Sequence, residues 1–106
     1  MRKDIKELAD AMQKGWKKVP RNTRRCSFAG PENNPSACCP LVHAIVGKTG
    51  KASWYNDSAN YFPVLNKQKV DSMSLKETIL KLADVYEWTT PQVIRWLRSH
   101  QNELTA

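Results

Sequence analysis

The chain has 106 residues, with 17 Lys and Arg against 10 Asp and Glu, and its formal charge is +7. This length is typical of one domain, here residues 1–106, with a core that needs neither a metal nor disulfides. The charge favours polyanionic partners such as nucleic acid, anionic lipid or an acidic protein surface. Because no stretch approaches the roughly 18 apolar residues of a membrane span and no signal-peptide pattern is present, we expect a cytoplasmic protein with no membrane partner. Its three cysteines should be reduced.

The first predicted helix carries its apolar residues at steps of three and four, namely Ile5, Leu8, Met12, Trp16 and Val19. Such spacing places them on one stripe, which we interpret as a core face, with a membrane-surface helix as the alternative. Pro20 ends this helix.

A cluster of six basic residues lies within twelve positions that contain no acid: Lys14, Lys17, Lys18, Arg21, Arg24 and Arg25. Charges beyond this cluster are nearly balanced, so the excess is local. We expect the cluster to contact phosphates or an acidic partner protein, and the alternative is a solvated surface without a partner.

The segment after the basic cluster predicts a strand or extended piece over residues 26–29, followed by a Gly30-Pro31 loop. Residues 37–46 then form an apolar run, which predicts a buried helix capped by Ser36 and ended by Gly47. Residues 48–69 lack a helical period but contain several aromatic residues, so we expect an irregular, aromatic-rich connection with short strands.

Residues 74–104 predict two helices joined by a turn of about four residues, 88–91. Ser74 and Glu77 have capping-box spacing, while Thr90 can cap the second helix and Pro91 suits its first position. The apolar positions are Leu75, Ile79, Leu82, Ala83 and Tyr86 in the first helix and Val93, Leu97 and Leu104 in the second.

Residues 82–97 resemble the helix-turn-helix motif of bacterial and phage regulators. Ala83 matches the small residue at the helix crossing, and Val93 and Trp96 match apolar positions of the recognition helix. Leu82 and Trp88 fit the remaining core positions. The sequence departs from the motif at Glu87, where the motif usually has Gly in a left-handed conformation that costs other residues about 1 kcal/mol.

The resemblance implies that the exposed start of the second helix reads base edges through Thr89, Thr90, Gln92, Arg95 and Ser99. Arg and Gln suit this task, because they pair with guanine and adenine through two hydrogen bonds. The alternative is a plain helical hairpin that completes the core, since the charges of residues 74–104 nearly cancel.

A second resemblance links residues 37–44, 62–65 and 88–97 to a group of small uncharacterised bacterial and phage proteins. Those proteins share a Cys-Ala-Leu-Gly-Ala-like helix start and a Phe-Pro element, although Val42 stands here where they have Gly. This resemblance implies no activity, and it suggests a phage or mobile-element origin.

The remaining reactive side chains do not form a recognisable catalytic or metal motif. Cys26, Cys38, Cys39 and His43 lack the paired-knuckle spacing of a structural zinc site, so packing roles are expected. A Cys39–His43 nucleophile pair would lack a third group. The sequence also has no paired carboxylates and no phosphate-binding glycine loop, so we expect no enzyme, metal or cofactor.

The sequence therefore predicts a mainly α domain of about four helices with an irregular, aromatic-rich middle and short strands. The leading functional hypothesis is a small DNA-binding or regulatory protein. The alternative is a protein-interaction module or inhibitor whose basic patch docks on an acidic partner, such as a host nucleic-acid enzyme.

Overall fold

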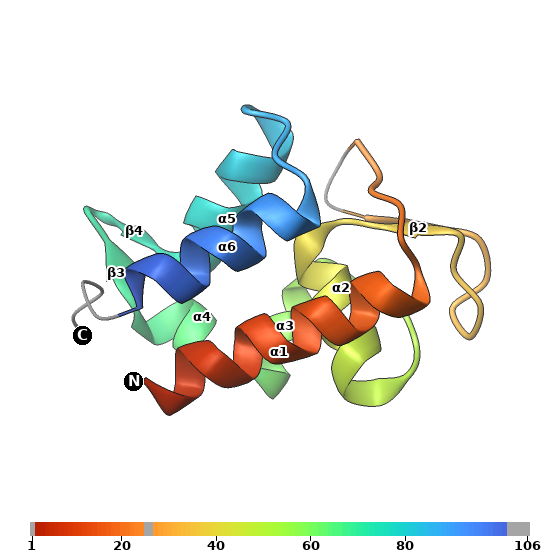
Figure 1. Cartoon of the computed structure of the whole chain (residues 1–106), viewed down its shortest axis with the longest axis horizontal. Helices are drawn as coiled ribbons and strands as arrows, with labels where there is room; N and C mark the ends of the chain where they lie inside the picture. Colours follow the sequence, from red (N-terminus) through yellow and green to blue (C-terminus); the bar gives the residue numbers. More distant parts are fainter. Residues whose placement is uncertain (1, 25–26, 102–106) are drawn as a thin grey trace.

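The computed structural model describes residues 2–24 and 27–101 and is mainly helical, as predicted (Figure 1). The α-helices are α1 (Lys3–Lys18), α2 (Pro40–Thr49), α3 (Ser58–Tyr61), α4 (Val64–Lys67), α5 (Leu75–Asp84) and α6 (Thr90–His100). The other elements are the 3-10 helix η1 (Tyr55–Asp57) and the strands β1 (Phe28–Ala29), β2 (Ala37–Cys38), β3 (Lys69–Val70) and β4 (Met73–Ser74). Helices α1, α2, α5 and α6 have ten residues or more, so the expected four helices and short strands are confirmed.

Both small sheets are antiparallel pairs that connect neighbouring parts of the chain. Strand β1 pairs with β2 so that Phe28 lies opposite Cys38, and β3 pairs with β4 so that Lys69 lies opposite Ser74. The irregular middle therefore ends in a hairpin that leads directly into α5, because Ser74 is both the last residue of β4 and the N-cap of α5.

Helix α1 buries the apolar stripe that its sequence predicts. Ile5, Leu8 and Met12 are completely buried, and Val19 caps the end of the helix just before Pro20. In Figure 1, α1 and α6 run side by side in opposite directions, with α2 packed against α1. The core lies between these three helices and α5, where Leu41, Ile79 and Leu97 are completely buried.

Two glycines allow α1 and α2 to approach until their backbones touch. A Cβ atom on Gly15 would lie 2.7 Å from the carbonyl carbon of His43, and closer still to its oxygen. On the other helix, a Cβ atom on Gly47 would lie 2.6 Å from the carbonyl carbon of Ala11. Since real Cβ atoms do not approach a backbone this closely, only glycine fits at either position.

The predicted boundaries of α2 are wrong at both ends. Residues 37 and 38 form β2 instead of a first helical turn, so the N-cap is Cys39 instead of Ser36, and Pro40 occupies the first turn, where its missing N–H does no harm. The helix passes through Gly47 and ends at Gly50, whose φ of 85° is left-handed. Gly47 allows the close crossing with α1, and Gly50 forms the C-terminal cap of α2. The expected burial of the helix is confirmed, because residues 40–46 are all buried.

The C-terminal hairpin has the two predicted helices, with corrected boundaries. Ser74 caps α5 by accepting a hydrogen bond from the Glu77 N–H. Helix α5 ends at Asp84, and Tyr86 lies beyond it with 59% of its surface exposed, so Tyr86 does not belong to the apolar face. Thr89 caps α6, whereas Thr90 is already its first residue.

The second helix of the hairpin contributes to the core as predicted over its described length. Val93 and Leu97 are completely buried, and Leu104 lies outside the described residues. None of the described helices is long and apolar enough to cross a membrane.

Candidate nucleic-acid interface

The start of α6 is held by a buried hydrogen-bond network centred on Thr90. Its hydroxyl lies 2.7 Å from Nδ1 of His43 and accepts from the Asn22 side-chain amide at 2.7 Å. The Thr90 N–H donates to Oδ1 of Asn22 at 3.0 Å, and the Asn22 amide also donates to the Cys38 carbonyl. The network therefore connects α6 with α2, β2 and the segment after α1.

The partners of His43 determine which ring nitrogen carries the proton. Nε2 lies 2.8 Å from the Val19 carbonyl, which can only accept, so Nε2 donates. Nδ1 is then the acceptor for the Thr90 hydroxyl. Burial lowers the pKa of His43 to about 4, although the hydrogen bond to the Val19 carbonyl acts in the opposite direction. His43 is thus a neutral, satisfied histidine, and the Trp16 ring packs edge-on against it with centroids 5.3 Å apart.

The structure removes Thr90 from the predicted base-contact set. This residue is completely buried, because its side chain points into the network with Asn22 and His43 instead of toward solvent. The sequence could not reveal this, since His43 lies 47 positions away. The other four predicted contacts, Thr89, Gln92, Arg95 and Ser99, are exposed.

Within this exposed set, the side chains differ in how free they are. Gln92 completes a capping box, because its Oε1 accepts from the Thr89 N–H at 2.7 Å. The Ser99 hydroxyl donates to the Arg95 carbonyl at 2.6 Å. The Arg95 guanidinium forms no ion pair with any described residue, so it is the freest of the predicted base-contact side chains.

The basic cluster is exposed at Lys14, Lys17, Lys18, Arg21 and Arg24, and Arg25 lies outside the described residues. It falls into two parts. Lys14 and Lys18 line a hollow of about 370 Å³ with Lys48 at the end of α2, and Lys18 donates to the Gly50 carbonyl at 3.0 Å. Residues 21–24, by contrast, continue toward the start of α6, where Asn22 bonds to Thr90.

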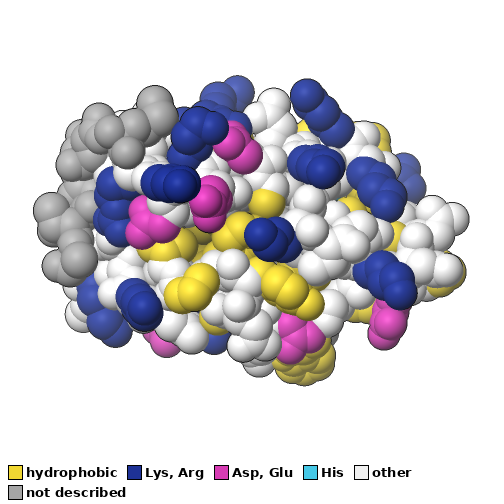
Figure 2. Space-filling model, turned by 90° about the horizontal axis from the view of Figure 1, so that it is seen from below, with side chains coloured by type: hydrophobic (Ala, Val, Ile, Leu, Met, Phe, Trp, Pro, Cys, Tyr) yellow, Lys and Arg dark blue, Asp and Glu magenta, His cyan; other side chains and the backbone are white. Residues whose placement is uncertain are grey.

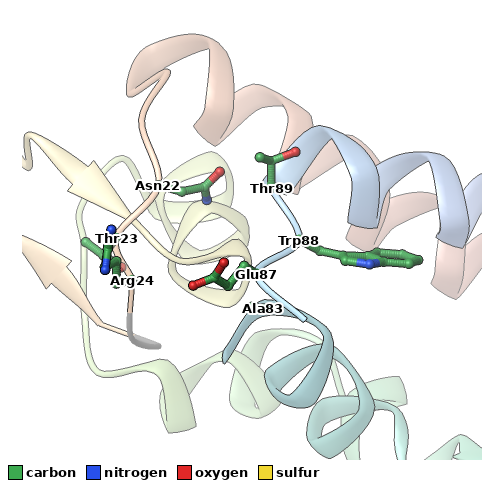
Figure 3. A pocket seen from close by; sticks show the side chains of 7 residues that line it. All are labelled: Asn22, Thr23, Arg24, Ala83, Glu87, Trp88 and Thr89. Carbon is green, nitrogen blue, oxygen red and sulfur yellow. The ribbon is translucent and has the colours of Figure 1, made fainter. Parts of the chain in front are cut away.

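A second hollow, of about 200 Å³, lies between residues 22–24 and the α5–α6 turn (Figure 3). Arg24 lines one wall, and Ala83, Glu87 and Thr89 line the other. Glu87 has a φ of 56°, the left-handed conformation for which glycine is usual. In Figure 3 its carboxylate points toward residues 22–24, while the Trp88 ring points away from them.

Replacing Glu87 by Gly should stabilise the protein by about 1 kcal/mol, because glycine adopts positive φ without the Cβ clash. Denaturant unfolding followed by circular dichroism measures this change. Asp84→Gly is the contrasting control: in the last turn of α5 it should be destabilising. A less stable Glu87→Gly variant would contradict the strain argument.

The two described cysteines are buried, and no described feature activates them. Burial raises the pKa of the Cys38 thiol to about 11, so its thiolate is scarce at neutral pH. His43 cannot serve Cys39 as a base while both its nitrogens are bonded to Val19 and Thr90. No group of three or more metal-binding side chains occurs among the described residues, and Cys26 lies outside them.

Sequence reasoning missed Asn22, whose hydrogen bonds to Thr90 link the basic segment to α6. No local signal marks it, because its function depends on partners 16 and 68 positions away. It also missed the exposure of Trp54, which is 61% exposed and stacks on Tyr55 at a centroid distance of 5.3 Å. Comparisons of the chain with protein-family models, curated proteins and solved structures found no match.

Proposed function

We propose that this protein binds duplex DNA, with the exposed side of α6 facing the bases and the basic segment contacting phosphates. The observation that carries the proposal is a shared location. Residues 21–24 lie at the end of α6 from which Thr89, Gln92 and Arg95 are exposed, and the Asn22–Thr90 hydrogen bonds fix them there.

The charge along α1 favours one orientation of the DNA. The charges in its first half nearly cancel, and Asp10 there accepts from Lys6 at 2.7 Å and from Arg98 at 2.9 Å, which partly offsets these two cations. Its end carries Lys14, Lys17 and Lys18, which form no ion pair among the described residues. Figure 2 views the molecule from below relative to Figure 1. On the face that it shows, most acidic side chains lie on one half, whereas basic side chains lie across all of it. A phosphate backbone would therefore follow the end of α1 and the segment after it.

The burial pattern of α6 limits what it can read. Thr90, Val93 and Leu97 are completely buried and Ile94 is nearly so, which confines the exposed residues to the other side of the helix. Gln92 and Arg95 are three positions apart on this side and are the residues suited to base recognition. The turn before α6 has the left-handed residue that helix-turn-helix motifs place there.

The proposal is tested by fluorescence anisotropy with labelled duplex DNA at several salt concentrations. Affinity should fall steeply with salt, and Arg21→Ala with Arg24→Ala should reduce the slope of log affinity against log salt by about 2. The matched control is Lys67→Ala with Lys69→Ala, which removes the same charge from exposed positions on α4 and β3. Equal slopes for the two double variants would contradict the assigned phosphate surface.

The base-reading role is tested separately by selection from a random duplex library. Arg95→Ala should weaken binding to the selected site about tenfold and relax its sequence preference, because one side-chain pair with a base is lost. Gln92→Glu should change the preferred base while keeping the capping box, which Glu also completes. Unchanged selected sequences for both variants would remove the base-reading claim.

A second candidate function is protein interaction, which the exposed Trp54 and Tyr61 support. Aromatic side chains are enriched at protein interfaces and costly to leave in water. A pull-down from nuclease-treated lysate distinguishes the two functions: partners that survive nuclease favour a protein partner, and partners that disappear favour nucleic acid.

A further inference from the structure

Glu87 adopts a left-handed backbone conformation that is unfavourable for a glutamate. Its φ of 56° lies where glycine is favoured, and the resulting strain is of order 1 kcal/mol. A 2.9 Å hydrogen bond from the Trp88 N–H to the Leu82 carbonyl holds the turn in this conformation, but the Glu87 carboxylate makes no hydrogen bond or ion pair with any described residue. A strained residue with an unused charged group in a hollow indicates a ligand-binding role.

The opposite wall of the same hollow supplies the complementary group. Arg24 is exposed there and has no carboxylate partner among the described residues. Glu87 can accept two hydrogen bonds, whereas Arg24 can donate two in parallel. A ligand that fills this space should therefore carry neighbouring donors and acceptors on different edges.

The hollow is open to solvent, and its size suits the insertion of about one ring system. Its volume is about 200 Å³, and a cavity of about 150 Å³ is large enough for benzene. One nucleobase can enter it, but a base pair cannot. The base must then be unpaired, and unpaired bases are commonly held by side chains on their exposed edges.

We propose that this hollow binds one unpaired guanine beside the duplex contacted by α6. Guanine offers O6 and N7 as acceptors for Arg24, and its N1–H and N2 amino group as paired donors for Glu87. Adenine, cytosine and thymine do not present two adjacent donors to a carboxylate. This inference rests on the proposed nucleic-acid function and specifies the base that the site selects, with Arg24 contacting a phosphate in fully paired DNA and the guanine where one is unpaired.

The turn beside the hollow provides a surface for a neighbouring base. Tyr86 is 59% exposed and directly precedes Glu87 but does not line the hollow, so its ring is open to a base that stays outside it. Stacking of bases on aromatic side chains tolerates any sequence. Tyr86 thus contributes affinity, while Glu87 and Arg24 contribute the preference for guanine.

The test compares labelled duplexes of one sequence that are either fully paired or carry a single bulged guanine, adenine, cytosine or thymine. The full-length protein should bind the guanine bulge about tenfold more tightly than the other bulges. Glu87→Gln should abolish this preference while strengthening binding to the paired duplex, because it removes one negative charge near the phosphates. A purely electrostatic role would strengthen binding to all five duplexes equally.

The matched control is Asp84→Asn, which removes the same charge from an exposed residue that does not line the hollow. It should strengthen binding without changing the preference for guanine. Equal affinity for the four bulges, or a preference that survives Glu87→Gln, would overturn the guanine site even if paired duplex binds. Salt-dependent binding to none of the five duplexes would instead overturn the proposed function, and with it the guanine site. Binding to the guanine bulge alone would support the guanine site and would contradict the proposal that α6 binds fully paired DNA.

Discussion

Replacing Gly15 or Gly47 by Ala should destabilise the protein by about 3 kcal/mol or more, or prevent it from folding. Each added methyl group would meet the backbone of the opposite helix, at His43 for Gly15 and at Ala11 for Gly47. A side chain could rotate away from such a clash, but a helix backbone cannot. The two helices would have to separate, which would open the core around Leu8, Met12 and Leu41.

This expectation can be checked by guanidinium unfolding of each variant, with circular dichroism to confirm that a folded state exists. Gly50→Ala is the control, because nothing lies within 4 Å of its added methyl group and only the left-handed φ of 85° is unfavourable. It should lose about 1 kcal/mol. At an exposed helical site, Gly→Ala is normally stabilising by up to about 1 kcal/mol, so stabilisation by Gly15→Ala or Gly47→Ala would show that α1 and α2 do not touch.

Lowering the pH from 6.5 to 4 should destabilise the native protein by up to about 3 kcal/mol because of His43. The pKa of His43 is about 4 in the folded chain, against an ordinary value of 6.5. As the pH falls below 6.5, the unfolded chain therefore binds a proton that the folded chain does not, and unfolding becomes easier. Above pH 6.5 both states have a neutral ring, and below about pH 4 the loss is complete.

The structural cause of this pH dependence is the network around the ring. Protonation would convert Nδ1 into a donor, although the Thr90 hydroxyl now donates to it and already accepts from Asn22. Nε2 already donates its hydrogen bond to the Val19 carbonyl. The charged ring would thus gain no new acceptor in a buried site.

The measurement is the free energy of unfolding at pH 4.2 to 7.5 for the wild type and for His43→Gln. The variant should be less stable at pH 7 but should show a much flatter dependence on pH. His100→Gln changes the histidine content while keeping His43, so it should retain the wild-type dependence. Hydrogen bonds from Arg2 and Lys6 help to hold the pKa of Asp4 and Asp10 below the ordinary 3.8, which confines their contribution to lower pH. A wild-type curve as flat as that of His43→Gln would contradict the role of His43.

The sequence by itself determined the elements whose signals are local. Steps of three and four between Ile5, Leu8 and Met12 predict α1, and capping residues at Ser74 and before Pro91 predict α5 and α6. Helical period and caps act between residues a few positions apart, so they can be read directly from the chain. Glu87, by contrast, adopts the left-handed conformation although no glycine marks this position in the sequence.

Only the tertiary structure decided which faces of these elements remain available. Thr90 is not a surface residue, because His43 and Asn22 bond to it. Gly47 lies at the crossing with α1 instead of ending its helix, which Gly50 does. Residues 37–38 pair with β1 instead of joining α2, which also could not be read from an apolar run. These outcomes depend on contacts between distant positions, where burial and backbone hydrogen bonding override local preference. The hairpin is therefore encoded locally, whereas the surface that it presents is set by the helices and segments packed around it.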